Sequence, residues 1–222
     1  MPSKSVFRWL DGRGWLVLSG GGDGASEIRA QALGRLAADG GVAYIPLSGN
    51  LETAEAVLED MLDLGAPSGY LVDVSAEDDA TITAKLADAG IIVIEASASA
   101  AEARSALLGA AVEGIQAAYE HGAVILAEGL SAMAFGDWLV KDDGTVMPGL
   151  EWLDGALIAP GVTNAAAWAR ELLLEYPLVF VVGIGASSAL ALGPDGQLEA
   201  WGDGEITVAL GRSYASNPEE PE

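Results

Sequence analysis

From Trp15 to Ala127 the sequence alternates strand-length apolar runs with longer segments of helical patterning. Continuous apolar runs are typical of strands buried on both faces, and each run here is followed by a helical segment. This order predicts parallel strands joined by right-handed crossovers. The expected strands span residues 15–18, 42–47, 70–74, 91–94 and 123–127, and the expected helices span 25–38, 51–64, 79–87 and 100–119. We therefore predict an α/β fold with a doubly wound, mainly parallel sheet and helices on both faces.

The pattern changes after Lys141, where short strands follow one another with turn signals between them. Such closely spaced strands favour hairpins, so we expect an antiparallel C-terminal hairpin edge. The expected elements are strands at 156–159, 178–182, 188–192, 197–201 and 206–210, and a helix at 164–174. We expect a single domain over residues 1–213 and an acidic, disordered tail over residues 214–222.

The charge balance excludes several classes of partner. The chain has 10 Lys and Arg against 33 Asp and Glu, a net charge of −23. Nucleic acids and anionic membrane surfaces both require clustered basic residues, so neither is an expected partner. Cysteine is absent, which excludes disulfides, thiolate metal sites and cysteine nucleophiles. With no signal-peptide pattern and no apolar segment of about 18 residues, we expect a cytoplasmic protein without cofactor or metal. Its apolar surface could support a homodimer.

The segment after the expected strand 123–127 carries the most chemical information. It reads Gly129-Leu130-Ser131-Ala132-Met133-Ala134, and we expect a helix to continue through 135–139, with Phe135 and Trp138 on one face. A sharp strand-to-helix turn of this kind can expose a serine hydroxyl as a nucleophile. Ser131 is therefore the candidate nucleophile, and the alternative is that it only caps the helix.

The order of motifs along nearly the whole chain resembles the S51 peptidases, the family of cyanophycinase and the aspartyl dipeptidases, within the class I glutamine amidotransferase-like fold. The motifs that carry the resemblance lie at residues 18–23, 119–125, 129–134, 149–153 and 183–190. The resemblance implies a serine nucleophile at Ser131. It also implies a histidine after segment 149–153, an acid near 183–186, and oxyanion-hole amides from a Gly-Gly turn after strand 91–94.

The chain departs from the family at each of these supporting positions. Gly161 stands where the histidine is implied, Gly185 stands where the acid is implied, and Glu95-Ala96-Ser97-Ala98 replaces the Gly-Gly turn. The one histidine of the chain, His121, precedes strand 123–127 whereas Ser131 follows it. The two residues should lie about 20 Å apart at ~3.3 Å per strand residue, whereas a general base must lie within about 3 Å.

We therefore predict a catalytically inactive protein that keeps this fold and reuses the former active-site cleft for binding or structure. The acidic residues expected there favour a small or cationic ligand, with Asp137 near the cleft. The predicted cleft residues are Gly21, Gly22, Asp23, Glu95, Ala96, Glu128, Gly129, Ala132 and Gly161.

Two alternatives remain open at the level of sequence. The first is a serine hydrolase or peptidase that uses Ser131 with an unconventional base, such as Lys141 or the carboxylate of Glu128. The second is a nucleotide-binding protein, because the Gly20–Gly24 loop fits the dinucleotide fingerprint between a strand and a helix. The acidic residue expected about 20 positions later in that fingerprint is absent.

Overall fold

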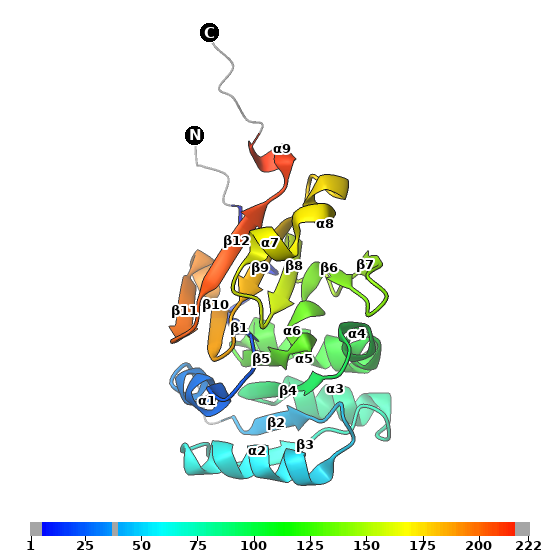
Figure 1. Cartoon of the computed structure of the whole chain (residues 1–222). Helices are drawn as coiled ribbons and strands as arrows, with labels where there is room; N and C mark the ends of the chain where they lie inside the picture. Colours follow the sequence, from blue (N-terminus) through cyan, green and yellow to red (C-terminus); the bar gives the residue numbers. More distant parts are fainter. Residues whose placement is uncertain (1–5, 37–39, 216–222) are drawn as a thin grey trace.

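The computed structural model describes residues 6–36 and 40–215, and the chain forms two β-sheets with helices around them (Figure 1). The strands of the larger sheet are β1 (Trp15–Ser19), β2 (Val42–Ile45), β3 (Gly69–Leu71), β4 (Ile91–Ser97), β5 (Val124–Gly129), β10 (Ser188–Leu192) and β11 (Leu198–Gly202). The strands of the smaller sheet are β6 (Gly136–Val140), β7 (Val146–Pro148), β8 (Leu153–Pro160), β9 (Phe180–Ile184) and β12 (Ile206–Leu210). The helices are α1 (Ala25–Leu33), α2 (Leu51–Asp63), α3 (Asp79–Ala87), α4 (Ala100–Leu107), α5 (Ala110–His121), α6 (Leu130–Met133), α7 (Ala165–Trp168), α8 (Arg170–Glu175) and α9 (Arg212–Ala215).

The larger sheet has the strand order β11-β10-β1-β5-β4-β2-β3. Its five strands from β1 to β3 are parallel, and the β10–β11 hairpin lies antiparallel along β1. This arrangement confirms the predicted α/β fold with a mainly parallel sheet. The later strands do not all join that sheet, because β6, β8 and β9 form a second parallel set and β12 pairs with β9.

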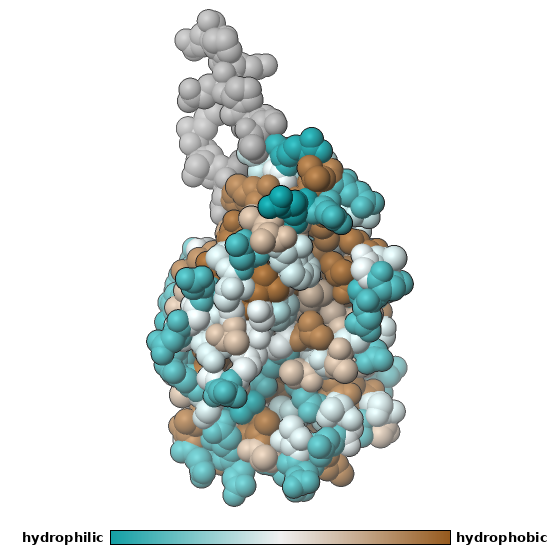
Figure 2. Space-filling model, in the orientation of Figure 1, coloured by the Kyte–Doolittle hydropathy of each residue, from teal (hydrophilic) through white to brown (hydrophobic). Residues whose placement is uncertain are grey.

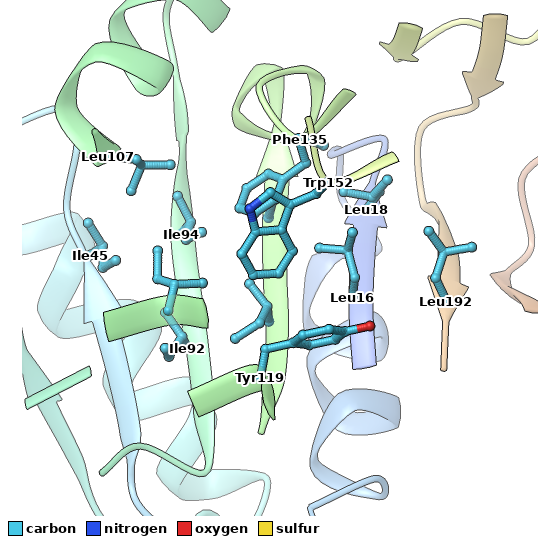
Figure 3. Packing of buried hydrophobic residues seen from close by; sticks show 14 of the residues in the cluster. Leu16, Leu18, Ile45, Ile92, Ile94, Leu107, Tyr119, Phe135, Trp152 and Leu192 are labelled. Carbon is cyan, nitrogen blue, oxygen red and sulfur yellow. The ribbon is translucent and has the colours of Figure 1, made fainter. Parts of the chain in front are cut away.

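Helices cover both faces of the larger sheet, as the continuous apolar strands predicted. Helices α1 and α2 cover one face, and α3 and α5 cover the other. The core on the α3–α5 face continues into strands β8 and β9 of the smaller sheet, and Figure 3 shows Phe135 and Trp152 packed together in this core. At that junction the Trp152 ring lies 5.3 Å from Tyr119 and 5.2 Å from Phe135, centroid to centroid. This aromatic contact joins the two sheets into one hydrophobic core.

Local capping explains why some helices begin where the sequence predicts. The Asn50 side chain accepts from the backbone N–H groups of Glu52 and Thr53, and α2 starts at the next residue after Asn50. The Asp78 carboxylate accepts from the Thr81 N–H at 3.1 Å, which fixes the start of α3. Both residues are preferred N-caps because their side-chain oxygens satisfy otherwise unpaired amides of the first turn.

Four predicted helices differ from the structure. The helix expected at 100–119 is two helices, because Leu108 is extended and Gly109 takes a positive φ of 88°. The helix expected through 135–139 is the strand β6, so Phe135 and Trp138 do not share a helix face. The helix expected at 164–174 is divided into α7 and α8 at Ala169. The helix expected at 25–38 ends at Leu33, and residues 37–39 lie outside the described part of the chain.

The first two residues of the predicted tail, Tyr214 and Ala215, belong to α9. Residues 216–222 lie outside the described part of the chain, so the tail stays a prediction. Across the described ranges, no helix has the length and apolar character needed to cross a membrane.

Candidate functional site

The turn between β5 and α6 exists as predicted, but its strained residue is not the serine. Gly129 takes φ 55° and ψ −135° at the end of β5, and α6 starts at Leu130. Ser131 lies inside α6 and is not among the residues with positive φ. In a nucleophile elbow the nucleophile itself occupies the strained position, which is what exposes its hydroxyl. The elbow position of this chain is therefore Gly129, which has no side chain.

The Ser131 hydroxyl is buried and hydrogen-bonded to the backbone. Ser131 is fully buried, and its Oγ donates to the carbonyl oxygen of Glu95 at 2.5 Å and accepts from the N–H of Ser97 at 3.0 Å. Both partners belong to β4, so the hydroxyl ties α6 to that strand. The Ser97 amide lies in the stretch where the resemblance implied oxyanion-hole donors, and here it is directed at a hydroxyl.

Among the described residues, Ser131 is hydrogen-bonded to two backbone groups and to no titratable side chain. His121 is exposed at the end of α5, where its Nδ1 lies 2.6 Å from the carbonyl oxygen of Ala117. It precedes β5 whereas Ser131 follows β5, as predicted. Lys141, the other base considered from the sequence, lies in the turn after β6 and pairs with Asp143 at 3.5 Å.

The carboxylate of Glu128 is not part of an open cleft, contrary to the prediction of an acidic site. Glu128 is buried, and its two oxygens accept from Nε and Nη2 of Arg29, each at 2.9 Å. Arg29 also donates through Nη1 to Asp60 at 3.0 Å. These groups lie between the sheet and helices α1 and α2. The bidentate pair offsets the charge that was expected to attract a cation.

Glu95 is also buried and fully bonded. Its carboxylate accepts from the N–H groups of Leu47 and Ser48 at 2.6 and 2.7 Å, and from the Ser48 hydroxyl at 2.7 Å. Its role is to hold the loop after β2 against β4. Burial first of all, and then the negative charges of Glu95 and Glu128, raise the pKa of the Tyr44 hydroxyl, which lies near both carboxylates.

The space beside the Gly20–Gly24 loop is occupied by the turn that follows β9. A Cβ on Gly20 would lie 2.1 Å from the carbonyl oxygen of Gly185, and the N–H of Ser187 donates to the Gly21 carbonyl at 2.7 Å. The N–H of Gly24 donates to the Ser187 hydroxyl at 3.1 Å. A dinucleotide loop needs its amides and the space above them free for a pyrophosphate. Here the turn after β9 occupies that space, which weighs against the nucleotide alternative.

Several predicted cleft residues do come together around Gly129. A Cβ on Gly21 would lie 3.5 Å from the Gly129 Cα, and a Cβ on Gly129 would lie 3.0 Å from the Ala96 Cβ. Gly22 and Asp23 are exposed on the same loop as Gly21. The contact at the elbow is therefore made by glycine and alanine, whose side chains carry no functional group.

The remaining predicted residues lie apart from this contact. Ala132 is fully buried inside α6, and Gly161 is exposed at the end of β8, where its N–H donates to the Ile184 carbonyl. Nothing lies within 4 Å of a Cβ built on Gly161, so the position implied for the histidine is open space. Asp137 lies at the start of β6, where it accepts from the N–H of Gly155 at 3.1 Å. Across the described residues, no group of three or more His, Asp or Glu side chains could hold a metal ion.

The signal missed from the sequence is Arg29. It follows Ile28 on the side of α1 that also buries Ala32. A basic residue on the apolar face of a helix is typical of a buried ion pair, and it could have directed attention to Glu128.

No protein-family model matches the sequence, and no curated protein sequence matches it. Solved structures do match. A peptidase from an acI-B1 actinobacterium superposes with a TM-score of 0.73 at 17% identity, over 90% of this chain and 91% of that one. A putative peptidase E protein from Listeria monocytogenes EGD-e superposes with a TM-score of 0.65 at 15% identity, over 86% and 98%. The chain therefore has a peptidase-like fold, as the resemblance to S51 peptidases predicted.

Proposed function

We propose that this protein is a catalytically inactive relative of the peptidases that share its fold, and that it has a binding or structural role. The observation that carries the proposal is that Gly129, and not a serine, occupies the strained elbow position. Covalent catalysis needs a nucleophile exposed at that position. A glycine there supplies no attacking atom.

The state of Ser131 supports the same proposal. Its hydroxyl donates a hydrogen bond to the Glu95 carbonyl oxygen and accepts one from the Ser97 N–H, so the oxygen is already engaged both as donor and as acceptor. The oxygen would have to leave two backbone partners before it could attack a substrate, and the buried N–H and C=O would then be unpaired. This makes Ser131 a structural residue and argues against the alternative of a hydrolase with an unconventional base.

The test is labelling of the intact protein with a fluorophosphonate probe, read by intact mass. We expect no mass increase for the wild type under conditions where an active serine peptidase of the same fold is fully labelled. Addition of one probe to the wild type, lost in Ser131→Ala, would show an activated serine and overturn the proposal.

Stability measurements distinguish a structural serine from an unused one. Ser131→Ala leaves the Glu95 carbonyl and the Ser97 N–H without their partner, so it should lower the free energy of unfolding by about 1–3 kcal/mol. Ser105→Ala is the matched control, because Ser105 is exposed and donates only to the Ala101 carbonyl within α4. Its cost should stay within about 0.5 kcal/mol. Equal costs for the two variants would contradict the structural role of Ser131.

A further inference from the structure

A cavity of about 470 Å³ lies where three strands of the smaller sheet begin, and it plays no part in the site described above. Its walls come from the starts of β6, β8 and β9 and from the chain around α8 and α9. The volume falls within the range of small-molecule sites, about 300–1,000 Å³. Over α7, α8 and β12, Figure 2 shows hydrophobic and hydrophilic residues next to one another.

This cavity is separate from the elbow region. Gly21, Ala96 and Gly129, which meet at the elbow, are not among the residues that line it. A ligand in this cavity would therefore not occupy the former active site.

Aromatic side chains form part of the wall. Trp138 on β6 and Tyr176 after α8 both line the cavity, and their ring centroids are 6.4 Å apart with planes inclined by 35°. Tyr214 from α9 lines it as well. Aromatic rings present a negative face, and several rings around one space are the usual means of binding an ammonium group.

Carboxylates complete the lining. Asp137, Asp154 and Glu175 line the same cavity, and the single basic residue among its lining residues, Arg8, is paired with Asp154 at 2.5 Å. Partial burial raises the pKa of Asp137. The hydrogen bond from the Gly155 N–H lowers this pKa, whereas the negative charges of Glu151 and Asp154 raise it further. A carboxylate in this position gains from a cation beside it.

The combination of rings and carboxylates selects the class of ligand. The carboxylates disfavour an anion, and the aromatic walls offer no ligand atoms to a hard metal ion. Leu178 lines the cavity and is 72% exposed, so it provides apolar surface for an alkyl chain. We propose that this cavity binds the ammonium group of a small alkylamine, with Asp137 as its counter-charge and Trp138 and Tyr176 as its aromatic wall.

The probe for the test is butylammonium chloride, titrated into ¹⁵N-labelled protein while the tryptophan indole N–H resonances are followed. Trp138→Phe assigns the Trp138 resonance by its loss. We expect a saturable shift of that resonance with butylammonium and none with 1-butanol or with sodium chloride at the same ionic strength. A shift of equal affinity with 1-butanol, or no saturable shift, would overturn the proposal.

Variants separate a specific site from the general attraction of an acidic protein. Asp137→Asn keeps an acceptor for the Gly155 N–H and should weaken binding about tenfold, and Trp138→Leu should weaken it about fivefold. Asp203→Asn is the matched control, since Asp203 is exposed in the turn between β11 and β12 and does not line this cavity. It should change the Kd less than twofold.

Equal effects of Asp203→Asn and Asp137→Asn would mean that only net charge matters, and would refute the site. If Asp137→Asn fails to fold by circular dichroism, Glu175→Gln on the exposed end of α8 replaces it. That variant should weaken binding at least threefold, and unchanged affinity would count against the proposal.

Discussion

The ion pair between Arg29 and Glu128 allows a quantitative test of how the region beside the elbow is built. The two side chains are only 11% and 10% exposed, and they share two hydrogen bonds of 2.9 Å. Arg29→Met would leave the Glu128 carboxylate buried without its cation. Removing one partner of a buried pair costs about 3–5 kcal/mol. For a domain of this length that corresponds to a fall in Tm of about 6–20 °C.

Urea unfolding followed by far-UV circular dichroism measures this loss as a lower midpoint at unchanged slope. Lys141→Met is the matched control, because the Lys141–Asp143 pair is 3.5 Å long with side chains 40% and 61% exposed. Such an exposed pair contributes less than about 1 kcal/mol. The double variant Arg29→Met/Glu128→Leu should lose much less than the sum of its single variants, since no unpaired charge remains.

The reasoning fails if Arg29→Met costs no more than Lys141→Met. That result would mean that water solvates Glu128 and that the carboxylate belongs to an open acidic cleft, as first expected from the sequence. A large loss that is recovered in the double variant supports a closed, internally neutralised interface between α1 and the sheet.

Two further predictions concern the backbone at the elbow and the alkaline limit of stability. Gly129→Ala should lower the free energy of unfolding by about 2–3 kcal/mol, because Gly129 has a positive φ and an added Cβ would lie 3.0 Å from that of Ala96. Gly49→Ala is the control, since Gly49 has φ 70° but open space around it, and it should cost about 1–2 kcal/mol. Equal losses in urea unfolding would contradict the effect of the close approach. Burial, followed by the charge of Asp11, raises the pKa of Tyr119 to about 12. A raised folded-state pKa stabilises the protein below the unfolded pKa of about 10, so stability should fall by about 2–3 kcal/mol between pH 10 and 12. Tyr119→Phe should make the unfolding free energy less dependent on pH between about pH 10 and 12. An unchanged slope would mean that other groups, such as Tyr44, cause the loss of stability.

The α/β architecture could be predicted because its signals are local and agree with one another. The expected helix at 79–87 has the bounds of α3, and the Asp78 cap explains why. The expected helix at 51–64 differs from α2 by one residue. In contrast, β6 could not be predicted, because the apolar residues after Ser131 are compatible with either a helix or a strand. Their pairing with β8, which makes them a strand, is not visible in the local sequence.

The arrangement of the site was harder to predict because it depends on which face of a strand each side chain occupies. Both faces of β4 and β5 are buried, so polarity along the strands does not reveal that Glu95 and Glu128 lie on the α1–α2 side. The position of the elbow depends on a single backbone dihedral. Gly129 precedes the serine by two residues, and glycine is the residue type that takes positive φ most readily. The motif spacing instead indicated Ser131 as the elbow residue.

The proposed loss of activity raises the question of whether a single substitution could supply a catalytic residue. A serine at position 129 would place its Cβ 3.0 Å from that of Ala96, so the neighbouring turn after β4 would have to move. A Cβ at position 161 would meet no atom within 4 Å, so of the three positions only this one has open space for the implied side chain, although its φ of 75° strains any residue other than glycine. An acid at position 185 would place its Cβ 3.0 Å from the Glu205 carbonyl oxygen. Because two of the three positions are closed by backbone or by a neighbouring Cβ, Gly161→His should still fold, at a cost of about 1–2 kcal/mol from its positive φ, and yet produce no activity. A serine at position 129 or an acid at position 185 would additionally require the neighbouring backbone or side chain to move.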